Sequence, residues 1–327
     1  MNGQAITIRT ASLVARILSM NSQQSKSVEI VEVGPRDGLQ SESGVFSTAD
    51  KVEFINRLIS AGLRRIEITS FVNPKKVPQM ADAEAVLAAL KKRPDVRYVG
   101  LVLNQRGFER AAAAGCNEVG MAVVASDTFN RRNQGVGTDE SIAAWLEIAR
   151  TAHAQGIRPQ VTIGASFGCP FEGEVAVSRV IDVAKRVAQG NPYEVSFADT
   201  IGVGVPSQVS EILGRAREAL PGMRLRCHFH NTRNTGLANA YAAILEGVHA
   251  LDASTGGIGG CPFAPAATGN VPTEDLIYML HRAGISTGVD LDSLIETARW
   301  LQGPLGRVPP GMLAKAGSFP RTAPQAA

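Results

Sequence analysis

Short apolar runs alternate with longer amphipathic stretches along the chain from residue 28 onward. The first run, residues 28–33, has the length and the β-branched content of a strand. The stretch behind it places apolar residues at the spacing of one helix face, with Ser47 or Thr48 as the N-cap and Gly62 at its end. The pattern therefore predicts a strand followed by a helix.

The same unit recurs through most of the chain. The predicted strands are residues 28–33, 65–69, 97–103, 118–125, 160–165, 194–197, 225–230 and 250–254. The helices between them are expected within residues 48–61, 83–90, 105–114, 139–154, 175–187, 207–220 and 234–246, and residues 127–137 read as a polar connection. Two further helices, at 273–283 and 291–301, complete the pattern, which favours a closed (β/α)8 (TIM) barrel over an open sheet.

This pattern also divides the chain into three parts. Residues 1–26 carry basic, Ser and Thr residues but no acid, and are expected to form an extension outside the fold. Residues 27–302 form the predicted barrel domain. Residues 303–327 are rich in Pro and Gly, as expected of a tail that packs on the barrel or stays disordered. A cytoplasmic protein is favoured, although residues 1–26 also fit a mitochondrial transit peptide, and Met20 is an alternative start.

Composition excludes several classes of function. The net charge of +3 over 327 residues gives no support for binding nucleic acid or a membrane surface. No apolar run approaches the roughly 20 residues that a membrane span needs. The four cysteines are widely spaced and form no Cys-x-x-Cys motif, which fits a reducing compartment better than a disulfide framework.

Two of the five histidines, His228 and His230, lie two residues apart on a predicted strand. Residues at this spacing point to the same side of a strand, so both imidazoles can reach one metal ion. The alternative is a pair of packed or solvent-facing histidines. A Gly-rich run with Cys261 at its tip follows the next strand, and its glycines allow close approach of the backbone to a ligand. This run lacks the third glycine of a dinucleotide-binding loop and follows the last strand rather than the first. A nicotinamide-binding fold is therefore disfavoured.

Other polar residues follow the carboxyl ends of predicted strands, where the active sites of such barrels lie. Each also has a structural interpretation: a surface turn, an internal salt bridge between Glu67 and Arg36, or the capping of a loop. Together they bring a carboxylate, imidazoles and an amide oxygen to one rim, a ligand set that suits Mg²⁺ or Mn²⁺ better than Zn²⁺. The set comprises Arg36, Asp37, Glu67, Asp199, Thr200, His228, His230, Cys261 and Asn270.

Four motifs and the His-x-His pair resemble the 3-hydroxy-3-methylglutaryl-CoA (HMG-CoA) lyase family. They are residues 32–40 (EVGPRDGLQ), 66–72 (IEITSFV), 196–204 (SFADTIGVG) and 256–263 (GGIGGCPF). The resemblance extends over about residues 28–302. Arg-Asp and His-x-His alone are typical of a wider superfamily of metal-dependent lyases and Claisen synthases, and the loop with Cys261 separates the lyases from the isopropylmalate-type synthases.

The resemblance implies a retro-Claisen cleavage of (S)-HMG-CoA to acetyl-CoA and acetoacetate. It implies Mg²⁺ or Mn²⁺ held by Asp37, His228, His230 and Asn270. It also implies that Arg36 polarises the thioester carbonyl and that Glu67 is an essential neighbour. Cys261 would act as an acid/base on a mobile loop, and Asp37 or His228 would take the hydroxyl proton. Residues expected to surround the metal or the substrate are Asp199, Thr200, Gln40 and Ser70, and the expected assembly is a homodimer.

Departures from the family pattern leave the acyl group open. Residues 231–234 read NTRN where Asp-Thr-Tyr-Gly is expected, and Phe197-Ala198 replaces Leu-Gly. Citramalyl-CoA or a 3-hydroxy-3-alkylglutaryl-CoA is an alternative substrate. A Claisen synthase or aldolase on the same barrel, and a non-catalytic metal-binding scaffold, are further alternatives. Lys75, Lys76, Arg131 and Arg132 are candidate phosphate contacts, although such loop residues are usually only solvated.

Overall fold

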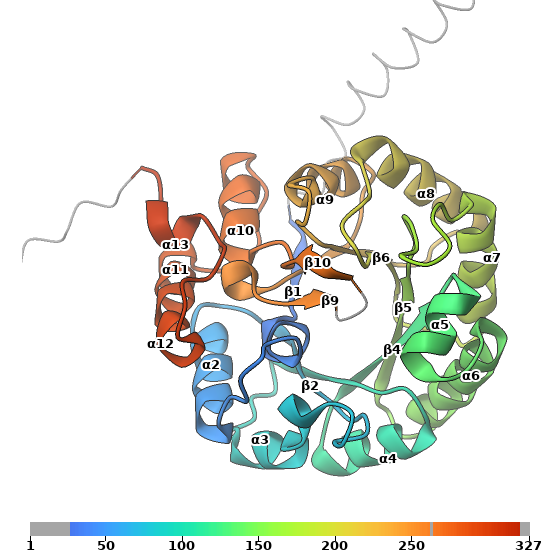
Figure 1. The fold of residues 1–327 in the computed structure, drawn as a ribbon, viewed down its shortest axis with the longest axis horizontal. Helices are drawn as coiled ribbons and strands as arrows, with labels where there is room; N and C mark the ends of the chain where they lie inside the picture. The colour runs from blue at the N-terminus through green and yellow to red at the C-terminus, as the bar shows by residue number, and fades with distance from the viewer. Residues whose placement is uncertain (1–26, 262–263, 321–327) are drawn as a thin grey trace, which may run out of the picture.

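The computed structural model describes residues 27–261 and 264–320 of the chain. Eight parallel strands follow one another around a closed barrel, and β8 pairs with β1 to complete it. Figure 1 shows the helices as a ring outside the strands. The (β/α)8 fold predicted from the alternation of apolar runs and amphipathic stretches is therefore confirmed.

The barrel strands are β1 (Glu29–Glu32), β2 (Arg65–Ser70), β3 (Arg97–Leu101), β4 (Glu118–Val124), β5 (Arg158–Gly164), β6 (Val195–Asp199), β7 (Leu225–Phe229) and β8 (Ala250–Ala253). The surrounding helices are α2 (Thr48–Ser60), α3 (Ala83–Ala89), α4 (Gln105–Ala114), α5 (Asp127–Gln134), α6 (Thr138–Ala154), α7 (Val177–Ala188), α8 (Pro206–Ala219), α9 (Gly236–Leu245), α10 (Thr273–Arg282) and α11 (Leu291–Trp300). Their apolar faces pack on the outside of the strands and form one large buried cluster.

Local sequence signals set the ends of these helices. Ser47 caps α2, since its hydroxyl oxygen accepts from the backbone N–H of Asp50 at 3.1 Å. Gly62 follows the C-cap of α2 with a φ of 103°, and a Cβ there would lie 2.6 Å from the carbonyl oxygen of Gly288. Only glycine satisfies both conditions, which explains why the helix stops at this point.

The sequence interpretation missed two elements on the side of the carboxyl ends of the strands. Residues 127–137, read as a polar connection, contain the helix α5, capped by Ser126, whose hydroxyl accepts from the N–H of Phe129. Few apolar residues mark this helix, so its periodicity is weak. The Gly-rich run after β8 contains a hairpin of β9 (Gly260–Cys261) and β10 (Ala264–Thr268), which lies across the centre of the ring in Figure 1.

The chain continues beyond α11 as two short helices, α12 (Gln302–Leu305) and α13 (Leu313–Ala316), beside α11 in Figure 1. The backbone N–H groups of Met312 and Leu313 donate to the carboxylate of Asp275 on α10, at 2.9 and 2.8 Å. The described part of the predicted tail thus packs on the barrel. Residues 1–26 and 321–327 lie outside the described residues. None of the described helices is long and apolar enough to cross a bilayer.

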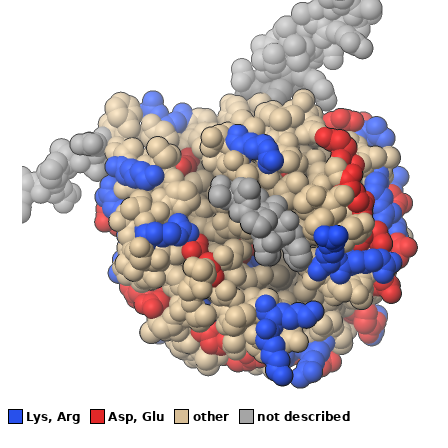
Figure 2. Space-filling model, in the orientation of Figure 1, with Lys and Arg blue, Asp and Glu red and all other residues tan. Residues whose placement is uncertain are grey.

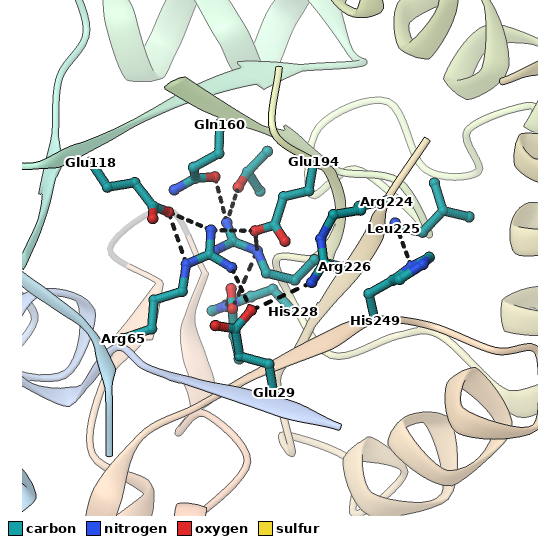
Figure 3. A network of polar contacts seen from close by, with 12 residues as sticks. Glu29, Arg65, Glu118, Gln160, Glu194, Arg224, Leu225, Arg226, His228 and His249 are labelled. Carbon is teal, nitrogen blue, oxygen red and sulfur yellow. Dashed lines mark hydrogen bonds and ion pairs between the residues drawn. The ribbon is translucent and has the colours of Figure 1, made fainter. Parts of the chain in front are cut away.

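The amino ends of the strands enclose a network of charged side chains, shown in Figure 3. Arg65 is fully buried; its Nε donates to Glu118 at 2.8 Å and its Nη2 to Glu194 at 2.6 Å. Glu194 also lies 3.2 Å from Nε of Arg226, and Glu29 lies 3.3 Å from Nη1 of Arg65. The interior of such a barrel is normally filled by branched apolar side chains, so buried charges here require close partners.

We predict that Arg65→Met destabilises the protein by about 3–5 kcal/mol, because it leaves the buried carboxylates of Glu118 and Glu194 without their shared cation. Urea unfolding followed by circular dichroism measures the change. Arg93→Met is the control, since Arg93 pairs with Asp95 on the surface, and we expect it to leave the stability nearly unchanged. A wild-type unfolding curve for Arg65→Met would contradict the importance of this network.

Candidate metal centre at the barrel mouth

A tight turn after β1 carries the first two candidate residues, Arg36 and Asp37. The turn, η1 (Gly34–Gly38), is a single π-helical turn in which the N–H groups of Asp37 and Gly38 donate to the carbonyl of Val33 at 2.7 and 3.3 Å. A Cβ on Gly34 would lie 2.5 Å from Oε1 of Glu32. Close packing therefore requires glycine at this position, and the turn holds its two charged residues at the carboxyl end of the barrel.

Arg36 lies between two carboxylates. Its Nε donates to Oε2 of Glu67 at 2.8 Å and its Nη1 to Oδ1 of Asp37 at 2.6 Å. Burial disfavours the charged form, but Glu67 and Asp37 more than offset this and raise the pKa of Arg36. The side chain of Glu67 is 7% exposed, so the salt bridge with Arg36 expected from the sequence is present and buried. The guanidinium is thus charged and fixed in orientation.

The structure brings the four predicted metal ligands together. One ligand atom from each of Asp37, His228 and His230 lies within 4.8 Å of the other two. Nε2 of His228 lies 4.0 Å from Oδ2 of Asp37, and the two imidazole rings are 5.1 Å apart between centroids. The Nδ2 of Asn270 donates to the same Asp37 oxygen at 2.9 Å, and His230 and Asn270 form a β-bridge.

Two buried atoms of this group have no hydrogen-bond partner among the described residues: Nδ1 of His230 and Oδ1 of Asn270. Buried polar atoms are nearly always paired, so unpaired ones require an explanation. Both atoms can offer a lone pair beside an ionised carboxylate. The donor set of one carboxylate, two imidazoles and one amide oxygen therefore fits a divalent cation such as Mg²⁺ or Mn²⁺.

The electrostatics favour the ligand forms of Asp37 and His230. For His228, burial is outweighed by Asp252 and Asp37, which raise its pKa. Burial opposes ionisation of Asp37, but Arg36 and the two histidines outweigh it and lower its pKa to about 2. Burial, followed by the neighbouring His228, lowers the pKa of His230 to about 4. At neutral pH Asp37 is thus a carboxylate and His230 a neutral imidazole, as cation binding requires.

Glu32, which the sequence interpretation did not single out, ties the turn of β1 to both ends of the Gly-rich loop. Its Oε1 accepts from the N–H groups of Gly34 and Thr255, at 2.8 and 2.9 Å. Its Oε2 accepts from the hydroxyls of Thr255 and Thr273, both at 2.7 Å. Nearby, the carboxylate of Glu274 accepts from the N–H of Gly256 at 2.9 Å. The available signal for Glu32 was a second acid, besides Glu29, in a strand whose other residues are apolar.

The remaining predicted residues lie around this group without belonging to it. Asp199 accepts from the N–H groups of Val203 and Gly204, both at 2.9 Å, and shapes the loop after β6. Burial raises the pKa of Asp199, although the hydrogen bonds from the N–H groups of Val203 and Gly204 partly oppose the shift.

Three other predicted residues make local contacts at the same end of the barrel. The hydroxyl of Thr200 accepts from the N–H of Ala165 at 2.9 Å. The Ser70 hydroxyl donates to Oε1 of Gln40 at 3.2 Å.

Cys261 ends β9, at the start of the hairpin that follows β8. Its side chain lies outside the described residues. Within the same loop, Gly259 has a φ of 118°, and a Cβ there would lie 2.6 Å from Nδ2 of Asn270. The loop backbone thus runs directly over the group of predicted ligands, which is the close approach expected of its glycines.

Comparisons with known proteins agree on one family. A sequence model of the HMGL-like family matches residues 27–301. The (R)-citramalyl-CoA lyase of Chloroflexus aurantiacus is 44% identical, over 89% of this chain and 95% of that protein. The hydroxymethylglutaryl-CoA lyase of Pseudomonas mevalonii is 42% identical, over 86% of this chain and 93% of that protein.

The structure of an HMG-CoA lyase from Acinetobacter baumannii, in complex with coenzyme A and 3-methylmalate, is also similar. It superposes with a TM-score of 0.88 at 39% identity, and the match covers 92% of this chain and 98% of that one. Relatives of known activity and the barrel itself lead to the same conclusion: the chain belongs to the HMGL-like family and is an enzyme with lyase activity.

Proposed function

We propose that this lyase is a cation-dependent enzyme that cleaves the carbon–carbon bond of a 3-hydroxy-3-methyl acyl-CoA, with HMG-CoA as the first candidate and citramalyl-CoA as the second. The proposal rests on the position of the charged Arg36 guanidinium next to the predicted ligands Asp37, His228, His230 and Asn270. The guanidinium suits a developing oxyanion, and the four predicted ligands suit a divalent cation.

Asp37, His228, His230 and Asn270 would hold the cation, which when bound acts as a Lewis acid and lowers the pKa of the substrate hydroxyl. Asp37 and His228 are the two groups able to take the hydroxyl proton. Arg36, oriented by Glu67, donates hydrogen bonds to the enolate oxygen that develops on the thioester as the carbon–carbon bond breaks. Cys261 would then protonate the carbanion to give acetyl-CoA.

Exposed basic residues support an acyl-CoA substrate. Lys75 and Lys76 follow β2, Arg131 and Arg132 lie on α5 after β4, and Arg233 follows β7, so all five lie at the carboxyl ends of strands. Figure 2 shows Lys and Arg side chains around the hollowed face that carries the hairpin. Such residues suit the phosphates of coenzyme A, although Arg131 also pairs with Asp127, and Arg233 donates to the carbonyls of Ile201 and Gly202.

The second candidate substrate rests on the similarity to the (R)-citramalyl-CoA lyase. Citramalyl-CoA has one methylene fewer than HMG-CoA between the tertiary carbon and the carboxylate. A pocket distinguishes such substrates by about 10- to 200-fold in kcat/KM. Two departures adjoin the candidate centre and could influence this choice. Ala198 on β6 is the register partner of His228, and Arg233 follows His230 by three residues.

We predict that the purified enzyme, with Mg²⁺, releases acetyl-CoA from HMG-CoA or citramalyl-CoA with a preference of at least about 10-fold for one of them. Mass spectrometry of the second product identifies the reaction, because HMG-CoA gives acetoacetate and citramalyl-CoA gives pyruvate. Both enantiomers of each thioester belong in the panel. Absence of acetyl-CoA from every thioester would refute the proposal, and full activity after chelation would refute the role of the cation.

We further predict that His228→Ala and Cys261→Ala each reduce kcat by at least about 100-fold, because each removes a group that acts on the reacting atoms. Only His228→Ala should also weaken the binding of Mn²⁺, measured by isothermal titration calorimetry. His281→Ala on α10 and Cys116→Ala in the core are the matched controls. Wild-type turnover in both site variants would be incompatible with the proposed chemistry.

A further inference from the structure

Asp252, a residue with no assigned role, lies beside one of the predicted metal ligands. Asp252 on β8 and His228 on β7 are direct neighbours in the parallel pairing of the two strands. Oδ2 of Asp252 lies 3.1 Å from Nδ1 of His228, and Asp252 is 7% exposed. A buried carboxylate at hydrogen-bond distance from an imidazole fixes both the ring and its tautomer.

The two ring nitrogens of His228 face different partners. Nε2 lies 4.0 Å from Oδ2 of Asp37 and thus faces the predicted cation position, whereas Nδ1 faces Asp252. His230 differs, because its buried Nδ1 has no hydrogen-bond partner among the described residues and is free to bind the cation. The two imidazoles are therefore not equivalent: a buried carboxylate pairs with Nδ1 of His228, whereas Nδ1 of His230 is unpaired.

Asp252 is itself held by the charged network below the site. Its Oδ1 forms an ion pair, without hydrogen-bond geometry, with Nε of Arg226 at 3.4 Å. The same Nε lies 3.2 Å from Oε1 of Glu194. Arg226 is buried, and its Nη2 donates to Oε1 of Gln160 at 2.6 Å and to the Thr162 hydroxyl at 3.1 Å, so it has little freedom to move. Figure 3 shows Arg226 between Glu194 and His228. Negative and positive side chains thus alternate from Glu194 through Arg226 to Asp252, which adjoins His228 at the candidate metal centre.

We propose that Asp252 is a positioning residue that accepts the Nδ1–H of His228 and directs Nε2 of that ring toward the cation, with Arg226 holding the carboxylate in place. Such an acceptor on the second nitrogen orients a metal-bound histidine and raises its basicity. The proposal rests on the cation site of the proposed function. In this arrangement Nδ1 of His228 carries a hydrogen and Nε2 binds the cation, so the ring has no free lone pair. Of the two candidate acceptors of the hydroxyl proton, only Asp37 then remains.

The test measures Mn²⁺ binding to the metal-stripped full-length chain by electron paramagnetic resonance. Asp252→Asn keeps the size of the side chain but removes its charge, and we expect it to weaken binding by about 10- to 100-fold. His228→Ala should weaken binding at least as much. Glu29→Gln is the matched control: Glu29 belongs to the same charged network at its half-exposed end, and this variant should bind Mn²⁺ within about twofold of wild type.

A second measurement needs no substitution at Asp252. In the Mg²⁺-loaded wild type, ¹⁵N NMR of the histidine rings should show Nδ1 of His228 protonated and Nε2 unprotonated. The opposite tautomer, or Mn²⁺ binding by Asp252→Asn within about twofold of wild type, would overturn the role of Asp252 alone. Failure of the wild type to bind Mn²⁺ would overturn the cation site of the proposed function and this inference with it.

Discussion

Charge compensation inside the barrel is the constraint on which the rest of the structure depends. A barrel interior is a poor solvent for ions, so each buried charge needs an opposite charge or several hydrogen bonds beside it. At the amino ends of the strands, Arg65 meets this requirement for Glu118 and Glu194. At the carboxyl ends, Arg36 does so for Glu67 and Asp37. The same principle that stabilises the fold thus orients the side chains that are available for chemistry.

The candidate metal centre is the place where this compensation is incomplete. Asp37 has a positive partner in Arg36. Two neutral atoms with lone pairs, Nδ1 of His230 and Oδ1 of Asn270, have no hydrogen-bond partner among the described residues. A divalent cation would satisfy all of them at once, whereas apolar packing would not. Glu32 keeps the Gly-rich loop above this group by holding both of the loop's ends. The arrangement is preorganised, since one ligand atom from each of Asp37, His228 and His230 already lies within 4.8 Å of the other two.

Much of this could be predicted from the sequence, because strand and helix periodicity place each strand end. Once the barrel was inferred, Arg36, Asp37, His228 and His230 had to reach the same rim, and the structure brings them together. The helix α5 was missed because its eight residues are nearly all polar. Glu32 and Asp252 were missed for a different reason: their roles depend on neighbours on other strands or loops, and an acid in a largely apolar strand does not reveal which contacts it makes.

Crystals of the full-length chain grown with Mn²⁺ and measured near the manganese absorption edge offer the most direct test of this account. It predicts one strong anomalous peak bounded by Asp37, His228, His230 and Asn270, with Arg36 next to it but not bound to the ion. Distances from the ion to the ligand atoms should be about 2.0–2.3 Å. A map with no peak at this position, or with the ion held by a different set of side chains, would contradict the account.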